Sequence, residues 1–375
     1  MKHKLSDILT CVLFCGFVTG MLVLFLLFPK ADFSPLEKRV LAAAPDTSVE
    51  AILSGEFGKQ AETYIADHIP GRDFFVGLSA YYDLVSGRQA TKDILVAGDR
   101  LVEKPNVMNG VAIARNMKYI NAFAEIIGQP VDLMIVPSAG FVLEDRVQGL
   151  HDDYTDDTIM EAIHAAAGEG VRPVSLVEAF TGAEDRGALY YRTDHHWTSL
   201  GAHTAACVYF GEKGYTDKPS EKYAVKRWEG FCGTTHSRSG LWLVQPDTVE
   251  LWDDGGSYTV TAYSSASDTV GTPHEGLFYL ERLEEQDMYT VFLNGNQPLV
   301  RIRNPEGEGK LLVIRDSYAN CLGGFLASHY AEVVLVDLRY WKTPVSQLTA
   351  EGFDDVLVCY SLYNFLTDTN FPWLK

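Results

Sequence analysis

Basic residues are scarce in this sequence. Its 375 residues include 31 Lys and Arg against 50 Asp and Glu, which gives a formal net charge of -19 at pH 7 with neutral His. No segment is locally rich in Lys or Arg. Nucleic acids bind proteins largely through contacts between Lys or Arg and their phosphates. The charge balance therefore argues against a nucleic-acid partner.

Cysteine is also sparse, and its spacing indicates no particular chemistry. Cys11 and Cys15 lie in an apolar N-terminal segment. The other four are far apart, with neither a Cys-x-x-Cys pair nor His at metal-ligand spacing: Cys207, Cys232, Cys321 and Cys359. These four are compatible with one disulfide or with four buried free thiols. We expect no metal site and no cofactor.

The chain has no internal repeat and no low-complexity tract. Because 47% of its residues are hydrophobic, it has enough apolar material for a core, which excludes an intrinsically disordered protein. Its length suits two modest domains or one large domain.

One long apolar run is present, at residues 8–28, and it contains no charged residue. A run of this length can cross a bilayer as a helix. A cleaved signal peptide is the alternative, but its apolar region is usually about 7–15 residues long, and no small-x-small cleavage site lies before residue 29. Lys2 and Lys4 precede the run and Lys30 follows it, so the positive-inside rule places the amino terminus in the cytoplasm. We expect an uncleaved single-pass anchor carrying an extracytoplasmic domain.

The segment after the anchor has helical character. Residues 49–82 carry apolar side chains at spacings of three and four, with a break at Ile69-Pro70-Gly71. Two short strand-like pieces then flank a hairpin-type turn at Gly98-Asp99, and residues 110–127 again read as a helix.

Beyond residue 130, short continuous apolar runs predict strands buried on both faces of a parallel sheet, at residues 131–136, 310–314, 333–336 and 356–358. A strand is also expected at 174–176, and helices at 158–168, 199–211 and within 318–330. Between about 215 and 303, period-two patterns with many Gly, Ser and Asp predict an antiparallel β insertion.

These patterns divide the chain into five parts. Residues 1–30 form a cytoplasmic tip and the transmembrane anchor, and residues 31–130 form a linker and an N-terminal helical region. Residues 131–214 and 304–375 are the two parts of one α/β domain, and residues 215–303 are the β-rich insertion between them.

The sharpest local motif is Thr193-Asp194-His195-His196-Trp197. In an extended segment, residues two apart share a face, so Asp194 and His196 are expected to point together while His195 points away. An Asp beside a His fixes the tautomer of the imidazole and stabilises the imidazolium. The motif indicates a catalytic pair. A structural His at a helix start, or half of a metal site, are the alternatives.

A second motif is Arg315-Asp316-Ser317, directly after the apolar run at 310–314. Ser317 is predicted to lie at the carboxyl end of a buried parallel strand, where α/β proteins place their functional sites. Its N–H, at the start of the following helix, is expected to face a developing oxyanion. An ordinary helix-capping Ser is the alternative.

Together these motifs resemble the DHHW protein family and, more distantly, the extracytoplasmic alginate O-acetyltransferases, which share the SGNH/GDSL hydrolase core in a permuted arrangement. The resemblance implies an α/β fold: an SGNH-hydrolase-like three-layer sandwich with a mostly parallel sheet and a β-rich insertion, preceded by one transmembrane helix. It rests on six segments, at residues 33–39, 64–72, 193–197, 295–299, 315–320 and 336–340.

The resemblance also implies roles for individual residues. Ser317 matches the nucleophile of the G-D-S block. In the separate D-x-H motif, His196 matches the general base and Asp194 the residue that orients this base. SGNH enzymes take an oxyanion donor from an Asn after the third core strand, and Asn364 is the candidate here. Arg315 stands where the block has Gly, so it is expected either to crowd the site or to contribute a charge to it.

Three residues are candidates for substrate binding: Arg315, Arg339 and Trp197. Arg339 is a candidate for holding a carboxylated glycan, although an Arg this close to a strand is usually a solvated or ion-paired side chain. Trp197 is a candidate sugar platform, although a Trp at such a position is more often a core plug beside the triad.

By resemblance, the expected function is serine-dependent O-acyl transfer, acetyl transfer above all, on a cell-surface polysaccharide at the outer face of a bacterial membrane. The implied acyl donor is an integral membrane O-acyltransferase. One alternative is a polysaccharide acetyl esterase that uses the same triad. The other is a non-catalytic glycan-binding or assembly protein on a degenerate SGNH scaffold, which the Arg315 departure favours.

Overall fold

The computed structural model describes residues 2–34, 36–88, 90–216 and 218–375. The chain divides into two compact units. The first, which we call the N-terminal unit, comprises Met1–Thr91 and Ser237–Leu243. The second, which we call the α/β unit, comprises Lys92–His236 and Val244–Lys375.

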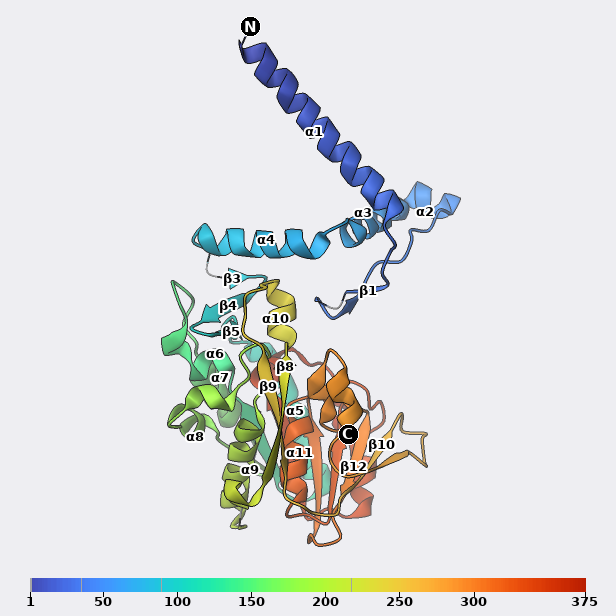
Figure 1. The fold of residues 1–375 in the computed structure, drawn as a ribbon. Helices are drawn as coiled ribbons and strands as arrows, with labels where there is room; N and C mark the ends of the chain where they lie inside the picture. Colours follow the sequence, from blue (N-terminus) through green and yellow to red (C-terminus); the bar gives the residue numbers. More distant parts are fainter. Residues whose placement is uncertain (1, 35, 89, 217) are drawn as a thin grey trace. The chain divides into compact units, whose positions relative to one another are not determined.

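The N-terminal unit is mainly helical (Figure 1). Its helix α1 contains a stretch, Lys4–Leu27, that is long and apolar enough to cross a membrane. The predicted break at residues 69–71 is confirmed, because one helix ends just before it and the next begins just after it. The elements are α1 (Lys2–Leu27), β1 (Phe33–Ser34), β2 (Arg39–Val40), α2 (Val49–Ser54), α3 (Glu56–His68), α4 (Arg72–Val85) and β3 (Ala90–Thr91).

A buried charge network connects the linker after α1 to α3 and α4. The Asp67 carboxylate accepts hydrogen bonds from Arg39 Nη1 and from the Ala42 N–H, each at 2.9 Å. Arg72 Nη2 donates to Glu37 Oε2 at 2.7 Å. The hydrogen bond from Arg39 outweighs the effect of burial and lowers the pKa of Asp67 to about 2. Two of the motif segments, 33–39 and 64–72, are thus held together by ion pairs.

The α/β unit is built on one eight-stranded sheet, with strand order β11-β10-β12-β14-β13-β15-β6-β7. Strands β14, β13, β15, β6 and β7 pair in parallel, whereas β12, β10 and β11 are antiparallel additions at one side. The strands are β6 (Val131–Val136), β7 (Val171–Val174), β10 (Thr259–Tyr263), β11 (Thr272–Glu275), β12 (Leu299–Arg303), β13 (Lys310–Arg315), β14 (Glu332–Val336) and β15 (Asp355–Ser361).

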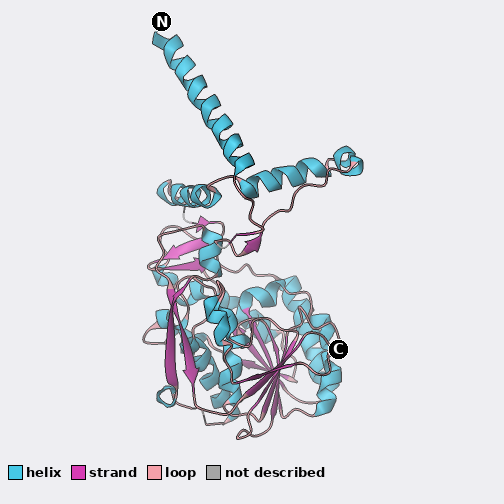
Figure 2. Ribbon diagram, turned by 45° about the vertical axis from the view of Figure 1, so that its right-hand side comes forward, coloured by secondary structure: helices cyan, strands magenta, loops and turns pink. Residues whose placement is uncertain are grey.

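Helices cover both faces of this sheet (Figure 2). The core on one face joins α5 (Gly110–Ile127), α7 (Asp156–Ala165) and α12 (Leu362–Thr367) to inward residues such as Val334 and Val336. Leu335 points to the other face because side chains alternate along a strand. There it meets Gly323 of α11 (Ala319–Ala327), which packs against α9 (Ser199–Lys213). The expected three-layer α/β architecture is confirmed.

The segment 215–303 differs from the predicted insertion. Strands β8 (Ala224–Phe231) and β9 (Asp247–Asp253) form a separate antiparallel hairpin, but β10, β11 and β12 extend the main sheet. β12 joins because Val300 and Ile302 bury one of its faces beside β14, and Leu299 buries the start of the other. The sequence pattern predicted antiparallel strands correctly but did not show which sheet they would enter.

The remaining elements largely follow the sequence. The hairpin of β4 (Ile94–Ala97) and β5 (Arg100–Glu103) is confirmed, while β7 begins at Val171, ahead of the strand expected at 174–176. Short helices α6 (Ala139–Val142), α8 (Val177–Thr181) and α10 (Thr234–Ser239) complete the order. All six described cysteines are free thiols.

Candidate active site

Ser317 lies in the connection between β13 and α11, at the carboxyl end of the parallel part of the sheet. The preceding residue ties this connection to the neighbouring strand, because Asp316 N donates to Cys359 O of β15 at 3.3 Å. The Asp316 carboxylate accepts from Tyr318 N at 3.0 Å and from Ser361 N and Oγ, each at 2.8 Å. These contacts hold the chain on both sides of Ser317 in place.

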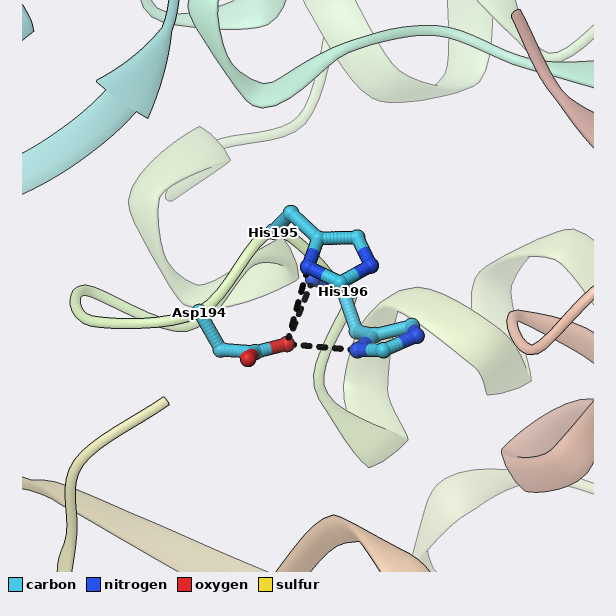
Figure 3. Close-up of side chains that lie close together, drawn as sticks. All are labelled: Asp194, His195 and His196. Atoms are coloured by element: carbon cyan, nitrogen blue, oxygen red, sulfur yellow. Dashed lines mark hydrogen bonds and ion pairs between the residues drawn. The ribbon is translucent and has the colours of Figure 1, made fainter. Parts of the chain in front are cut away.

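A continuous line of hydrogen bonds runs from Ser317 to Asp194. His196 Nε2 lies 2.8 Å from Ser317 Oγ, and His196 Nδ1 lies 2.5 Å from Asp194 Oδ1. Figure 3 shows the Asp194 carboxylate oxygen facing the imidazole of His196. The three side chains are all buried, with 7% of Ser317, 6% of His196 and 1% of Asp194 exposed. The structure thus brings together the three residues that the two motifs had selected.

The second oxygen of Asp194 is held by α10. Thr234 donates to Asp194 Oδ2 from its N–H at 2.7 Å and from its hydroxyl at 3.0 Å. A Cβ on Gly233 would lie only 2.2 Å from the Cβ of Asp194, so this approach requires a glycine. Burial by itself raises the pKa of Asp194, but the two imidazoles and the hydrogen bonds hold that pKa well below its usual value. Asp194 is therefore an anion that orients His196.

His195 departs from the expected geometry. It was predicted to point away from Asp194, but its Nδ1 lies 3.7 Å from Asp194 Oδ1 and its ring centroid lies 3.9 Å from that of His196. Both imidazoles face the same carboxylate (Figure 3). The reason is that residues 192–196 are bent rather than extended, so the two-residue alternation of a strand does not apply.

The local contacts of His195 differ from those of His196. Its Nδ1 is 2.5 Å from Thr234 Oγ1, and 26% of its side chain is exposed. Burial and the nearby His196 lower the pKa of His195. The potential ligand atoms of Asp194, His195 and His196 all lie within 4.8 Å of one another. A metal ion held there would have to replace the hydrogen bond between His196 and Asp194, so the donor set fits the triad geometry better than a metal site.

Aromatic rings enclose the base. The Tyr289 ring stacks on the imidazole of His196 with centroids 3.9 Å apart and planes inclined by 10°. The Tyr289 hydroxyl donates to Ser317 O at 3.4 Å. Tyr289 was not selected from the sequence, where it lies in the β-rich segment without a motif. The stacked ring fixes the plane of the His196 imidazole. No local sequence signal predicts this contact, because it arises from tertiary packing.

Trp197 is a core residue and not a sugar platform. It is fully buried, and its Nε1 donates to Tyr318 O at 3.0 Å. The prediction that it binds substrate is wrong, because a side chain without exposed surface cannot contact a glycan. Its position supports the chain immediately after Ser317.

Arg315 is also completely buried, so its predicted contact with substrate is wrong. Its guanidinium donates from Nη2 to Gln297 O at 3.2 Å and lies 3.6 Å from the Asp337 carboxylate. Burial lowers the pKa of Arg315, and the Asp337 charge opposes that shift. The side chain that replaces the Gly of the G-D-S block is therefore accommodated in a buried ion pair.

Arg339 binds the same carboxylate. Its Nε donates to Asp337 Oδ1 at 2.9 Å and its Nη2 to Asp337 Oδ2 at 2.6 Å, while 28% of its side chain is exposed. This agrees with the ion-paired alternative given above. Asp337 thus connects a fully buried arginine to a partly exposed one, and a substrate contact by Arg339 stays a prediction.

Asn364 lies in the first turn of α12, with its Nδ2 donating to Asp316 Oδ2 at 2.8 Å. The candidate oxyanion donor is therefore part of the Asp316 hydrogen-bond network. Its role as a donor to substrate stays a prediction.

Two further groups are potential oxyanion donors. Among the described residues, no group accepts a hydrogen bond from the Ser317 N–H, and its role toward an oxyanion stays a prediction. Asn296 lies in the motif segment 295–299 and was not predicted as a site residue. Its Oδ1 accepts from Arg315 Nη1 and Asn320 Nδ2, each at 3.3 Å, which fixes the orientation of its amide group. Only the fold brings this loop amide to the residues around Ser317.

A serine hydroxyl, an imidazole and a carboxylate in this order are the parts of a nucleophile activated by a general base. The geometry is that of a serine-dependent acyl-transfer or hydrolytic site. The catalytic roles of Ser317, His196 and Asp194 stay predictions.

Comparisons with known proteins agree with this class. Residues 115–281 match the family model of the SGNH hydrolase-like domain of the acetyltransferase AlgX. That segment contains Asp194 and His196 and ends before Ser317. The chain is also 26% identical, over 175 residues, to the probable alginate O-acetylase AlgJ of Pseudomonas syringae pv. tomato, with 43% of this chain and 44% of the relative aligned. The chain thus spans less than half the length of this curated relative.

Two solved structures share the fold. A DHHW family protein from Eubacterium siraeum is 22% identical with a TM-score of 0.61, covering 76% of this chain and 97% of the other. Bacillus cereus PatB1, solved with a sulfonyl adduct, is 21% identical with a TM-score of 0.63, covering 75% of this chain and 98% of the other. Part of the chain is thus similar in sequence to SGNH-like alginate O-acetyltransferases, and the chain shares the fold of a DHHW family protein.

Proposed function

We propose that the α/β unit catalyses serine-dependent O-acyl transfer, with acetyl as the acyl group. The observation that carries this proposal is the line of hydrogen bonds from Ser317 Oγ through both nitrogens of His196 to the Asp194 carboxylate. The relation to alginate O-acetylases supports acetyl as the group transferred.

In the first half of the reaction, Ser317 Oγ attacks the carbonyl carbon of an acyl ester while His196 Nε2 takes the hydroxyl proton. Asp194 stabilises the imidazolium that results. The tetrahedral intermediate collapses when the bond to the leaving alcohol breaks, and that alcohol receives the proton from His196. The product is an acyl-serine and a free alcohol.

In the second half, a sugar hydroxyl attacks the acyl-serine and gives its proton to His196. The ester bond to Ser317 breaks, Ser317 Oγ takes the proton back, and the acyl group leaves on the sugar. The Ser317 N–H and the oriented amide of Asn296 support stabilisation of the oxyanion in both halves.

The proposed acceptor is a cell-surface polysaccharide, and the proposed place is the extracytoplasmic side of a bacterial membrane, to which α1 anchors the chain. Alginate occurs in the name of the relative, the probable alginate O-acetylase AlgJ, and is not assigned to this chain as its acceptor. The proposed acyl donor is an integral membrane O-acyltransferase, since acetyl-CoA is not expected outside the membrane.

Acyl transfer to a sugar has two alternatives, hydrolysis by an esterase and a non-catalytic role. An acetyl esterase would use the same three residues with water in place of the sugar hydroxyl. The non-catalytic alternative depended on Arg315, but its guanidinium is taken up by Asp337 and Gln297 in a buried pair. That contact accounts for the Arg315 side chain and supports an intact site over a degenerate scaffold.

The test is mass spectrometry of the full-length protein after incubation with p-nitrophenyl acetate. We expect an acetyl adduct on Ser317 in the wild type and none in Ser317→Ala. Added polysaccharide oligomers should shorten the lifetime of the adduct and become acetylated, whereas an esterase would release only acetate. An adduct on another residue, or no adduct and no turnover in the wild type, would contradict the proposal.

A further inference from the structure

Helix α4 carries large apolar side chains on the surface of the N-terminal unit. We call the following five residues the apolar stripe: Phe74, Phe75, Leu78, Tyr82 and Val85. Their exposed fractions are 55%, 41%, 51%, 69% and 88%, respectively. With 3.6 residues per turn, these five positions fall within a sector of roughly 100°. Such an uncovered apolar stripe indicates a partner that the chain itself does not provide.

Charge on α4 is kept away from this stripe. Among the described residues of α4, the charged ones are Arg72, Asp73 and Asp83, and each falls outside the apolar sector. The buried residues Gly77 and Ala80 also lie outside it. The helix therefore has a face that packs on its own unit and a separate, uncharged apolar face that does not.

A distant segment of the chain enlarges the same surface. Trp242 stacks on Phe74 with ring centroids 5.5 Å apart, and a Cβ on Gly77 would lie only 2.0 Å from the Trp242 ring. The Leu243 N–H donates to the Tyr81 hydroxyl at 2.6 Å. Trp242 remains 39% exposed and Leu243 87% exposed. The indole thus extends the apolar stripe at its Phe74 end.

The stripe belongs to the same compact unit as the apolar helix α1. At the carboxyl end of α1, Phe25 makes an edge contact with Tyr64 of α3, with ring centroids 6.2 Å apart. Three residues, Ile69-Pro70-Gly71, then connect α3 to α4. When α1 spans a bilayer, its carboxyl end lies at one membrane surface, and its contact with α3 puts the helix that precedes α4 at that surface.

We propose that the apolar stripe, together with Trp242 and Leu243, lies in the interface between headgroups and acyl chains of the bilayer that α1 spans. Helices with an apolar face and a charged face lie in this plane. Trp and Tyr favour it because one end of each ring system is apolar and the other is polar. The N-terminal unit is then a platform held to the membrane by two contacts, one across it and one along it.

Continuity with α1 selects the bilayer as the occupant in preference to a second copy of the chain. α1 and α4 belong to one compact unit, and the Phe25–Tyr64 contact links α1 to the helix that precedes α4, which favours the bilayer spanned by α1 as the occupant. The uncharged character of the stripe also offers no ion pairs to a protein partner. This inference rests on the proposed membrane anchoring by α1 and not on the proposed acyl transfer.

The test uses full-length protein in phosphatidylcholine vesicles, with the photoreactive residue p-benzoylphenylalanine at one position of α4. The reporter variant replaces Leu78, and the matched control replaces Asp73, whose side chain is 54% exposed on the same helix. After irradiation, mass spectrometry of the α4 peptide should find a phospholipid adduct in the variant with the reporter at position 78. The control variant, with the reporter at position 73, should carry no such adduct. Tyr82→p-benzoylphenylalanine is a second reporter in case the Leu78 variant does not fold.

Three outcomes would overturn the proposal. A covalent dimer through position 78 would show that a second copy covers the stripe. Equal lipid adducts at 78 and 73 would show random contact with the vesicle. If protein that remains in the vesicles with unchanged circular dichroism gives no adduct at 78 or 82, the stripe is exposed to water and not embedded in lipid.

Discussion

The two compact units treat their apolar side chains in opposite ways. In the α/β unit, every residue of β14 and β15 is buried, and so is every residue of β13 after Lys310. In the N-terminal unit, α4 leaves five large apolar side chains in its stripe at least 41% exposed. Apolar residues therefore form a core in one unit, whereas in the other unit those of the stripe form an exposed surface.

Charges follow the reverse pattern. The α/β unit buries Arg315, Asp316 and Asp337 completely, whereas in the N-terminal unit the buried Asp67 pairs with Arg39, whose side chain is 41% exposed. Burying a charge is costly unless it is paired and hydrogen-bonded. The candidate site lies in the unit with completely buried ion pairs, and the exposed apolar stripe lies in the unit with the apolar helix α1.

The largest effect expected from this division is on catalysis. His196→Ala should lower turnover of an activated acetyl ester by on the order of 10²–10⁴-fold, because the general base is removed. Ser317→Ala should abolish it. Carbonate extraction should find both variants still in the membrane fraction, since α1 is unchanged.

His195→Ala is the matched control for this prediction. The His195 ring contacts Thr234 and not Ser317, so its loss should be clearly smaller than that of His196. Equal losses in the two variants at unchanged melting temperature would show that the base is assigned to the wrong imidazole.

The next effect is on the stability of the α/β unit. Arg315→Gly should lower the free energy of unfolding by about 2–3 kcal/mol, because Gln297 O loses its buried donor and Asp337 keeps only its pair with Arg339. Urea denaturation measures the change. Arg88→Ala, which breaks a solvent-exposed pair in the N-terminal unit, should cost only about 0–1 kcal/mol. Similar costs in the two variants would refute the contrast in charge burial.

A smaller effect is expected inside the N-terminal unit. Gly77→Ala should destabilise it by about 1–3 kcal/mol, because the new Cβ overlaps the Trp242 ring. Tryptophan fluorescence should report the displaced indole, while ester turnover should not change. Gly58→Ala on α3 is the control, since nothing lies within 4 Å of a Cβ there, and it should stabilise by about 0.5–1 kcal/mol. Destabilisation by both would point to backbone effects.

The smallest effect concerns acid stability. The pKa of Asp194 is held below 3.8 in the folded protein, so the contribution of this carboxylate to stability is complete above 3.8 and decreases as the pH falls below that value. Melting temperature measured against pH in this acid range should therefore fall less steeply in Asp194→Asn than in the wild type. Parallel curves would mean that Asp194 has no depressed pKa.

Local patterns of the sequence determined much of this structure. The continuous apolar runs predicted β6, β13, β14 and β15, and the helical spacing predicted α5 with the bounds that the structure has. Neighbouring residues carry that information, because a strand buried on both faces and an amphipathic helix each impose their own period. The two motifs also selected Asp194, His196 and Ser317 as candidates before their geometry was known.

The tertiary structure alone decided which distant groups meet. It placed His195 over the same carboxylate as His196, buried Arg315 against Asp337, and removed Trp197 from the surface. It also seated Trp242 at Gly77, 165 residues away along the chain, and left the apolar stripe of α4 uncovered. Sequence periods describe what faces inward or outward within one element, but they do not specify the partner. That choice depends on packing between elements far apart in the chain.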